Sequence, residues 1–199
     1  MVMGRLEPKK RIVGLLGGSF NPAHAGHLHI SLVALKKLKL DEVWWLVSPG
    51  NPLKDPLTLA PFEQRFASAK ALASHPGIKV SDFEQRAGTR YTADTLAKLM
   101  KRYPQVQFVW LMGADNLVQF HRWQRWDWIL KQVPVVVFDR APYSHGAKAA
   151  IAYQKMRKYL LKDNMINSHW RVPSLYYMHL KRDSHSSTAI RKLLGRGVK

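Results

Sequence analysis

The chain has 199 residues, of which 46% are hydrophobic and 23% charged, so it is long enough and apolar enough to fold around one core. It contains no cysteine, which excludes disulfides and thiolate metal sites and is compatible with a reducing compartment. Its formal net charge of +19 indicates anionic partners, namely nucleic acids, membrane surfaces or small phosphorylated molecules.

Neither a membrane span nor a signal peptide is expected. No stretch approaches the roughly 18 consecutive apolar residues of a spanning helix, and the opening MVMGRLEPKK lacks an apolar centre. We expect residues 1–10 to form a basic tail, residues 11–199 to form a single domain, and the protein to reside in the cytoplasm.

Short apolar runs alternate with helical patterns along the chain. The expected strands cover residues 12–16, 43–47, 78–83, 107–112, 133–138 and 175–180. The expected helices cover residues 25–39, 61–74, 92–102, 115–131 (with a break), 146–162 and 187–194. This alternation, with continuously apolar strands, predicts a parallel sheet with helices on both faces. Right-handed crossovers make a Rossmann-like, doubly wound α/β fold the simplest arrangement.

Ligands of such a sheet bind beyond the carboxyl ends of the strands, where the strand order reverses. If the order begins 3-2-1-4, that point lies between the first and fourth strands. The loops after these strands are GGSFNPAHAGH (17–27) and GADNLVQFHRW (113–123). The proline-rich segment 48–61 and the segment EQRAGTRYT (84–92) open at the same edge. The sequence therefore predicts one site at this edge.

The first loop combines flexible backbone with two histidines. Gly17 and Gly18 allow a tight turn and a close approach of the backbone to a ligand, and their N–H groups can cradle an anion together with the start of the next helix. His24 and His27 share a helix face. Phosphate binding is favoured, but two alternatives stay open: a metal site that also uses His29, and histidines that only cap the turn. The loop matches neither GxGxxG nor the P-loop pattern.

A second candidate anion site lies near the C-terminus, in SSTAIRKLL (186–194). Ser186, Ser187 and Thr188 supply hydroxyls and a helix N-cap, and Arg191 follows Thr188 by three residues on the same face. The alternative is an ordinary capped helix.

In their order, GGSFNPAHAGH and SSTAIR resemble the nucleotidyltransferase superfamily that carries the HxGH signature, and within it the bacterial nicotinate-nucleotide adenylyltransferases. The resemblance extends from Ile12 to Leu194. It includes RYTADTL (90–96), the tryptophan that ends GADNLVQFHRW, and FDRAPY (138–143). It implies that the phosphate of nicotinate mononucleotide attacks the α-phosphorus of ATP, so that the adenylyl group is transferred directly, with no covalent enzyme intermediate, giving pyrophosphate and nicotinate adenine dinucleotide in NAD biosynthesis.

The resemblance also implies roles for individual residues. His24, His27 and Arg191 would be catalytic. The ATP site would consist of Gly17, Gly18, Ser19, Phe20, His24, His27, Ser187, Thr188 and Arg191. Mg²⁺ would come with ATP, held by phosphate oxygens and water rather than by protein side chains alone.

On the acceptor side, Trp123 matches a tryptophan that stacks on the pyridinium ring. Its alternative role is core packing, as expected for Trp44 and Trp45. Backbone N–H groups of Tyr91 and Thr92 would meet the carboxylate. The remaining acceptor candidates are Asp115, which would hold a ribose hydroxyl or help orient a metal bound to phosphate, and Lys54 and Arg140 for phosphate.

Three positions depart from the family pattern. Asn21 replaces an aspartate, NPLK (51–54) lacks a histidine, and Arg90 replaces a serine and adds a cation near the acceptor. The expected partners are ATP and nicotinate mononucleotide, with no stable nucleic-acid partner and no membrane, and the oligomeric state is open. Alternative functions are another small HxGH enzyme, such as pantetheine-phosphate adenylyltransferase, or a basic nucleic-acid-binding module.

Overall fold

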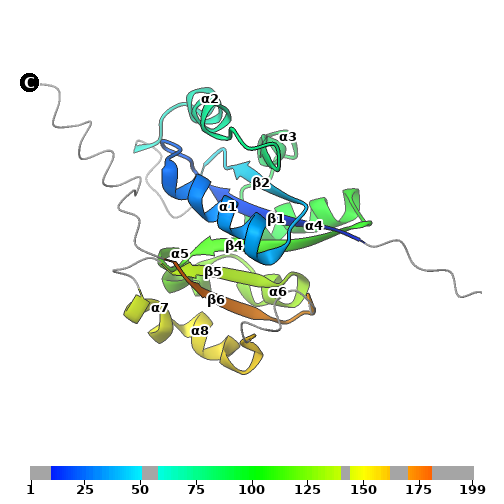
Figure 1. Cartoon of the computed structure of the whole chain (residues 1–199), viewed down its shortest axis with the longest axis vertical. Helices are drawn as coiled ribbons and strands as arrows, with labels where there is room; N and C mark the ends of the chain where they lie inside the picture. The colour runs from blue at the N-terminus through cyan, green and yellow to red at the C-terminus, as the bar shows by residue number, and fades with distance from the viewer. Residues whose placement is uncertain (1–9, 51–57, 140–143, 162–169, 181–199) are drawn as a thin grey trace, which may run out of the picture.

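A computed structural model describes residues 10–50, 58–139, 144–161 and 170–180, which form one parallel six-stranded sheet in the order β3-β2-β1-β4-β5-β6 (Figure 1). The strands are β1 (Arg11–Gly18), β2 (Glu42–Val47), β3 (Ile78–Ser81), β4 (Val106–Gly113), β5 (Val135–Asp139) and β6 (Leu175–His179). Every neighbouring pair is parallel. The expected Rossmann-like α/β fold and the reversal of strand order at β1 and β4 are confirmed.

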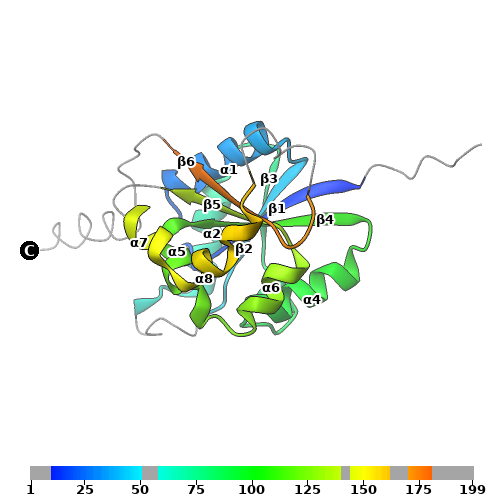
Figure 2. The same ribbon diagram turned by 90° about the horizontal axis from the view of Figure 1, so that it is seen from below.

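Helices cover both faces of the sheet. They are α1 (Ala25–Leu38), α2 (Phe62–Leu72), α3 (Phe83–Arg86), α4 (Thr92–Arg102), α5 (Ala114–Gln119), α6 (Trp126–Gln132), α7 (Ser144–Ala149) and α8 (Ile151–Met156), with short 3₁₀ turns η2 (Phe120–Arg122) and η3 (Arg157–Tyr159). Figure 2 shows α1 on one side of the sheet and α4, α6 and α8 on the other. None of the described helices is long and apolar enough to cross a membrane.

Two apolar cores result from this layering. Along β5, Val135 and Val137 join the core beneath α4–α8, whereas Val136 and Phe138 join the core beneath α1 and α2. Successive side chains of a strand point to opposite faces, so a strand covered on both sides must be apolar at every position. This is why the strands appear in the sequence as unbroken apolar runs.

Two expected elements differ from the observed ones, and one expected break is confirmed. The strand expected over 78–83 ends at Ser81, because the Ser81 hydroxyl accepts the Phe83 N–H at 3.2 Å as the short helix α3 begins. The helix over 115–131 is broken as expected, at an extended Trp123. The single helix expected over 146–162 is wrong: Ala150 has an extended backbone (φ −62°, ψ 141°) between α7 and α8. That bend lets both Ala147 and Ala152 reach the core.

Several expected elements lie outside the described residues. They are nine residues of the basic tail (1–9), part of the proline-rich loop (51–57) and the helix over 187–194.

Candidate functional site

The loop after β1 starts at the carboxyl edge of the sheet and is anchored there by Phe20. The backbone of Phe20 is left-handed (φ 46°), a strained conformation for a bulky residue. Its side chain is 1% exposed and stacks on Trp45, with ring centroids 5.2 Å apart. The side chain expected at the ATP site is therefore a core anchor that holds the preceding residues at the edge. Trp45 itself is fully buried, as expected for packing.

The two glycines of the loop differ in what they require. A Cβ atom on Gly17 would lie 2.6 Å from Cη2 of Trp110, which is too close for any side chain. A Cβ atom on Gly18 would lie 3.4 Å from the Phe20 ring, an ordinary contact. Gly17 is thus needed for packing, whatever its contact with a ligand. The Gly18 carbonyl accepts the Ser48 N–H at 2.9 Å and ties the ends of β1 and β2 together.

His24 and His27 form a reciprocal cap at the start of α1. His24 is the N-cap residue, and its Nδ1 accepts the Gly26 N–H at 3.1 Å. The His24 N–H is in turn donated to Nδ1 of His27 at 3.2 Å. The two rings lie 3.9 Å apart between centroids. This is a capping box built from histidines instead of hydroxyl and carboxamide groups.

The cap determines the tautomer of both rings. Because each Nδ1 accepts a backbone N–H, each neutral ring carries its hydrogen on Nε2. Each ring can therefore present an Nε2–H donor, and the α1 N-terminus adds positive potential. The capping and phosphate-binding interpretations are compatible, since they use different nitrogens. Within the described part of the chain, no group of three or more His, Cys or acidic residues is arranged to hold a metal ion.

Asn21 explains one departure from the family pattern. Its side-chain amide donates to the Thr58 carbonyl at 2.8 Å, and its Oδ1 accepts the Ala60 N–H at 3.1 Å. A carboxylate could accept the second bond but could not donate the first. The asparagine therefore fastens the first loop to the segment that leads into α2.

Arg65 is a buried arginine on α2 that was not predicted from the sequence. Its side chain donates four hydrogen bonds to backbone carbonyls, those of Ser19 and Ser48 at 2.7 Å, Ala60 at 2.8 Å and Pro49 at 3.2 Å. Arg65 is 2% exposed, and none of the ion pairs in the described part of the chain includes it. Burial lowers the pKa of Arg65, but a guanidinium stays charged at neutral pH. Carbonyl dipoles from three segments therefore surround a buried cation.

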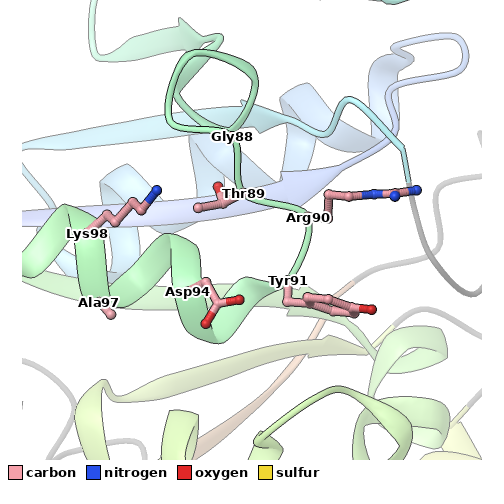
Figure 3. A pocket seen from close by; sticks show the side chains of 7 residues that line it. All are labelled: Gly88, Thr89, Arg90, Tyr91, Asp94, Ala97 and Lys98. Carbon is pink, nitrogen blue, oxygen red and sulfur yellow. The ribbon is translucent and has the colours of Figure 1, made fainter.

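The expected acceptor residues Tyr91 and Thr92 lie at the start of α4, as N-cap and first helical residue. The first N–H groups of a helix have no partner within it and attract anions. A surface pocket of ≈ 420 Å³ lies over this turn. Figure 3 shows the side chains of Arg90 and Tyr91 extending in one direction beside it, with Asp94 on the next turn. No residue of the histidine loop lines this pocket.

Trp123 lies at the rim of the core. Its ring meets Phe120 edge-on at 5.1 Å and Trp110 at 6.0 Å, and the residue is only partly buried. Packing is thus established for part of its surface, and stacking on a ligand stays a prediction. Asp115 lies half-buried in the first turn of α5, directly beyond β4.

The other site candidates are not placed. Lys54, Arg140, Ser187, Thr188 and Arg191 lie outside the described residues.

The sheet topology defines a Rossmann-like α/β protein, and residues 15–193 match the family model described as cytidylyltransferase-like. A Methylorubrum extorquens (strain PA1) protein named "Probable nicotinate-nucleotide adenylyltransferase" is 51% identical over 181 residues, covering 90% of this chain and 98% of the relative. A Cereibacter sphaeroides (strain ATCC 17025 / ATH 2.4.3) protein of the same name is 53% identical over 183 residues, covering 90% and 96%. The chain belongs to the cytidylyltransferase-like family, in its nicotinate-nucleotide adenylyltransferase branch.

Solved structures show the same fold. Plasmodium falciparum nicotinic acid mononucleotide adenylyltransferase complexed with NaAD superimposes with a TM-score of 0.70 at 18% identity, covering 92% of this chain and 84% of that one. The same protein complexed with APC gives 0.67 at 17% identity, with the same coverage.

Proposed function

We propose that the chain transfers the adenylyl group of ATP to nicotinate mononucleotide. A phosphate oxygen of the mononucleotide attacks the α-phosphorus of ATP, the bond to the bridging oxygen of the β-phosphate breaks, and pyrophosphate leaves. The products are pyrophosphate and nicotinate adenine dinucleotide. The observation that carries the proposal is the histidine cap at the start of α1, beyond the carboxyl end of β1, in which Nδ1 of each ring accepts a backbone N–H. Each neutral ring then carries an Nε2–H that can be donated to a phosphate oxygen beside the helix N-terminus.

In this proposal the chain acts by positioning and by charge stabilisation, with no covalent intermediate. His24 and His27 donate to ATP phosphates beside the backbone of Gly17, Gly18 and Ser19. We infer that Ser187, Thr188 and Arg191 hold the leaving pyrophosphate, and that Mg²⁺ neutralises phosphate charge while bound through ATP oxygens and water. Such an ion needs no carboxylate cage. The same proposal includes a cytoplasmic location, where ATP is available.

For the acceptor, we propose that the free N–H groups at the start of α4 meet the nicotinate carboxylate, and that Trp123 stacks on the ring. Asp115 would bind a ribose hydroxyl, and Lys54 and Arg140 the acceptor phosphate. The alternative acceptor is phosphopantetheine, and the alternative class is a nucleic-acid-binding module favoured by the charge of +19. The 51–53% identity to relatives named nicotinate-nucleotide adenylyltransferase favours nicotinate mononucleotide as the acceptor.

Comparing the acid and amide acceptors tests this function. With ATP and Mg²⁺, we expect kcat/KM to be at least about tenfold lower for nicotinamide mononucleotide than for nicotinate mononucleotide, because charge-assisted bonds to the carboxylate are worth about 1.5–3 kcal/mol. Pyrophosphate release is the measurement. Equal efficiency would refute the carboxylate site. If pyrophosphate were released with phosphopantetheine but with neither mononucleotide, the phosphopantetheine enzyme would be favoured. If no acceptor gave pyrophosphate and the protein shifted RNA on a gel in a salt-sensitive way, the nucleic-acid-binding module would be favoured.

Replacing Trp123 by alanine tests the stacking role. We expect the KM for the acceptor to rise about 5- to 30-fold, as loss of a cation–π contact worth about 1–2 kcal/mol would cause, with a smaller change in the KM for ATP. Trp123→Phe keeps an aromatic face and should recover part of the loss. Trp128→Ala is the matched control, because Trp128, like Trp123, is partly buried against the core, while the Arg125 guanidinium already lies over its ring at 4.6 Å. An unchanged acceptor KM in Trp123→Ala would leave only the packing role.

A further inference from the structure

Glu84, on the short helix α3, is a buried carboxyl group that the proposed chemistry does not use. It is 6% exposed, and its backbone carbonyl accepts the Thr89 N–H at 2.9 Å. Its side chain contacts two hydroxyl groups. Thr95 lies on α4 with Oγ1 at 3.2 Å from Glu84 Oε1, and Ser48 lies in the loop after β2. The carboxyl group thus lies between the proposed acceptor turn and a loop of the ATP side.

The hydroxyl groups of Thr95 and Ser48 each have one hydrogen to donate but more than one acceptor within reach. Oγ1 of Thr95 has one hydrogen, but Glu84 Oε1, Oγ1 of Thr89 at 2.9 Å and the Tyr91 carbonyl at 3.2 Å all lie within reach. The Ser48 hydroxyl likewise reaches both Glu84 and the Gly50 carbonyl at 3.0 Å. A protonated carboxyl donates one hydrogen of its own, which allows the hydroxyls to bond the backbone carbonyls. An ionised carboxylate only accepts, so it draws the hydroxyl hydrogens to itself.

Ser48 connects this group to the ATP side. Its N–H is donated to the Gly18 carbonyl, and its own carbonyl accepts Nη1 of Arg65 at 2.7 Å. A chain of contacts therefore runs from Gly18 through Ser48 and Glu84 to Thr95 and the Tyr91 carbonyl. The two halves of the proposed site meet at one carboxyl group.

None of the ion pairs in the described part of the chain includes Glu84. Asp82 and Arg86, at the ends of its own helix, pair with each other at 2.8 Å. On α4, Asp94 pairs with Arg125, and Nζ of Lys98 donates to the Ala87 carbonyl. Arg65 on α2 bonds carbonyls. The loop between α3 and α4 carries Arg90 and Tyr91, which are exposed. Burial raises the pKa of Glu84 to about 7, with bonds from Thr95 and Ser48 opposing the rise.

We propose that Glu84 is a positioning residue for the acceptor: in its protonated form it holds the turn 88–91 and the segment 48–50 in the arrangement that binds the mononucleotide. Raising the pH through neutrality ionises the carboxyl, redirects the hydroxyl hydrogens away from the Tyr91 and Gly50 carbonyls and loosens both segments. The proposal rests on the proposed function only for the identity of the acceptor.

Glu84→Gln tests it, because the amide keeps a donor and an acceptor at every pH. The acceptor phosphate titrates in the same range, so the ratio of acceptor KM between wild type and Glu84→Gln is the quantity to follow. We expect this ratio to be close to 1 at pH 6 and to rise about threefold to tenfold by pH 8.5, with little change in the KM for ATP. Glu84→Leu should raise the acceptor KM at both pH values. Glu63→Gln removes the same charge from an exposed position on α2 and should follow wild type.

Hydrogen–deuterium exchange keeps the test independent of catalysis. Over residues 88–95, wild type and Glu84→Gln should exchange alike at pH 6, and wild type should exchange faster at pH 8.5. If neither protein releases pyrophosphate with nicotinate mononucleotide but this exchange difference appears, the proposed function fails and the positioning of the turn stands. If the exchange difference appeared but the ratio of acceptor KM did not change between pH 6 and pH 8.5, Glu84 would support the fold without positioning the acceptor, and the proposal would be overturned. Equal exchange at both pH values would overturn it as well.

Discussion

Replacing His27 by alanine is expected to lower kcat about 10²–10³-fold, the effect of losing one donor to charge that develops in a transition state. The prediction depends on the tautomer that the cap imposes. Nδ1 of His27 accepts the His24 N–H, so its hydrogen is on Nε2, where it can be donated to a phosphate oxygen. Steady-state turnover with ATP and nicotinate mononucleotide measures the change.

Two further variants separate the cap from the chemistry. In His27→Asn the amide oxygen can replace Nδ1 and keep the cap, but no group reaches the position of Nε2. In His27→Gln the longer side chain can bring an amide N–H close to that position. We expect the free energy of unfolding of His27→Asn to be close to that of wild type, while its turnover falls as far as that of the alanine variant. We expect His27→Gln to retain more activity.

His29→Ala is the control on the same helix, and its turnover should stay within about twofold of wild type. Equal losses at His27 and His29, together with recovery on adding a transition metal, would support the alternative metal site instead. Turnover near wild type in His27→Ala would remove the residue from the mechanism.

The sheet order could be predicted because it depends on local patterns. Continuous apolar runs mark strands that are buried on both faces, and the handedness of the crossovers limits their order. The boundaries of α4 (Thr92–Arg102) agree with the expected ones. The break at Ala150 could not be predicted, because no Gly or Pro marks it and it follows from where Ala147 and Ala152 must pack.

The buried charged residues could not be predicted for a similar reason. In FEQRFASAK, Arg65 looks like any surface cation of an amphipathic helix. Its burial depends on the loops after β1 and β2 and the residues before α2 converging on it, which only the tertiary structure shows. Glu84 was expected in an open loop and lies instead in a helix packed against Thr95. Likewise, the pattern of the histidines suggested three separate roles, and only the hydrogen bonds show that capping and phosphate binding can use different nitrogens.

Replacing Arg65 by methionine is expected to lower the free energy of unfolding by about 3 kcal/mol, since each buried polar group left without its partner costs about 1–3 kcal/mol and the structure relaxes in part. Four carbonyls, those of Ser19, Ser48, Pro49 and Ala60, would lose their donor. Methionine is close to arginine in length, so the result reports the lost bonds more than a cavity. Urea unfolding with a constant m-value is the measurement.

The same substitution should also impair catalysis in the fraction that is folded. Arg65 bonds the loop that contains the histidines and the loop that begins with Ser48, so its loss lets the two move relative to each other. Because a misplacement of about 1 Å can cost about 10²-fold in rate, we expect kcat/KM to fall at least about tenfold for both substrates at a temperature where the variant is folded.

Two variants, Arg65→Lys and Lys70→Met, provide the controls. Arg65→Lys keeps the charge but offers a compact ammonium in place of the planar fork, so it should recover less than half of the lost stability. Lys70→Met removes a cation from the exposed side of α2, where it lies over Phe66, and should change stability by less than about 0.5 kcal/mol. If Arg65→Met and Lys70→Met behaved alike, the buried guanidinium would not be what joins the loops after β1 and β2. If Arg65→Met lost stability but kept kcat/KM, the arginine would support the fold without positioning the histidines.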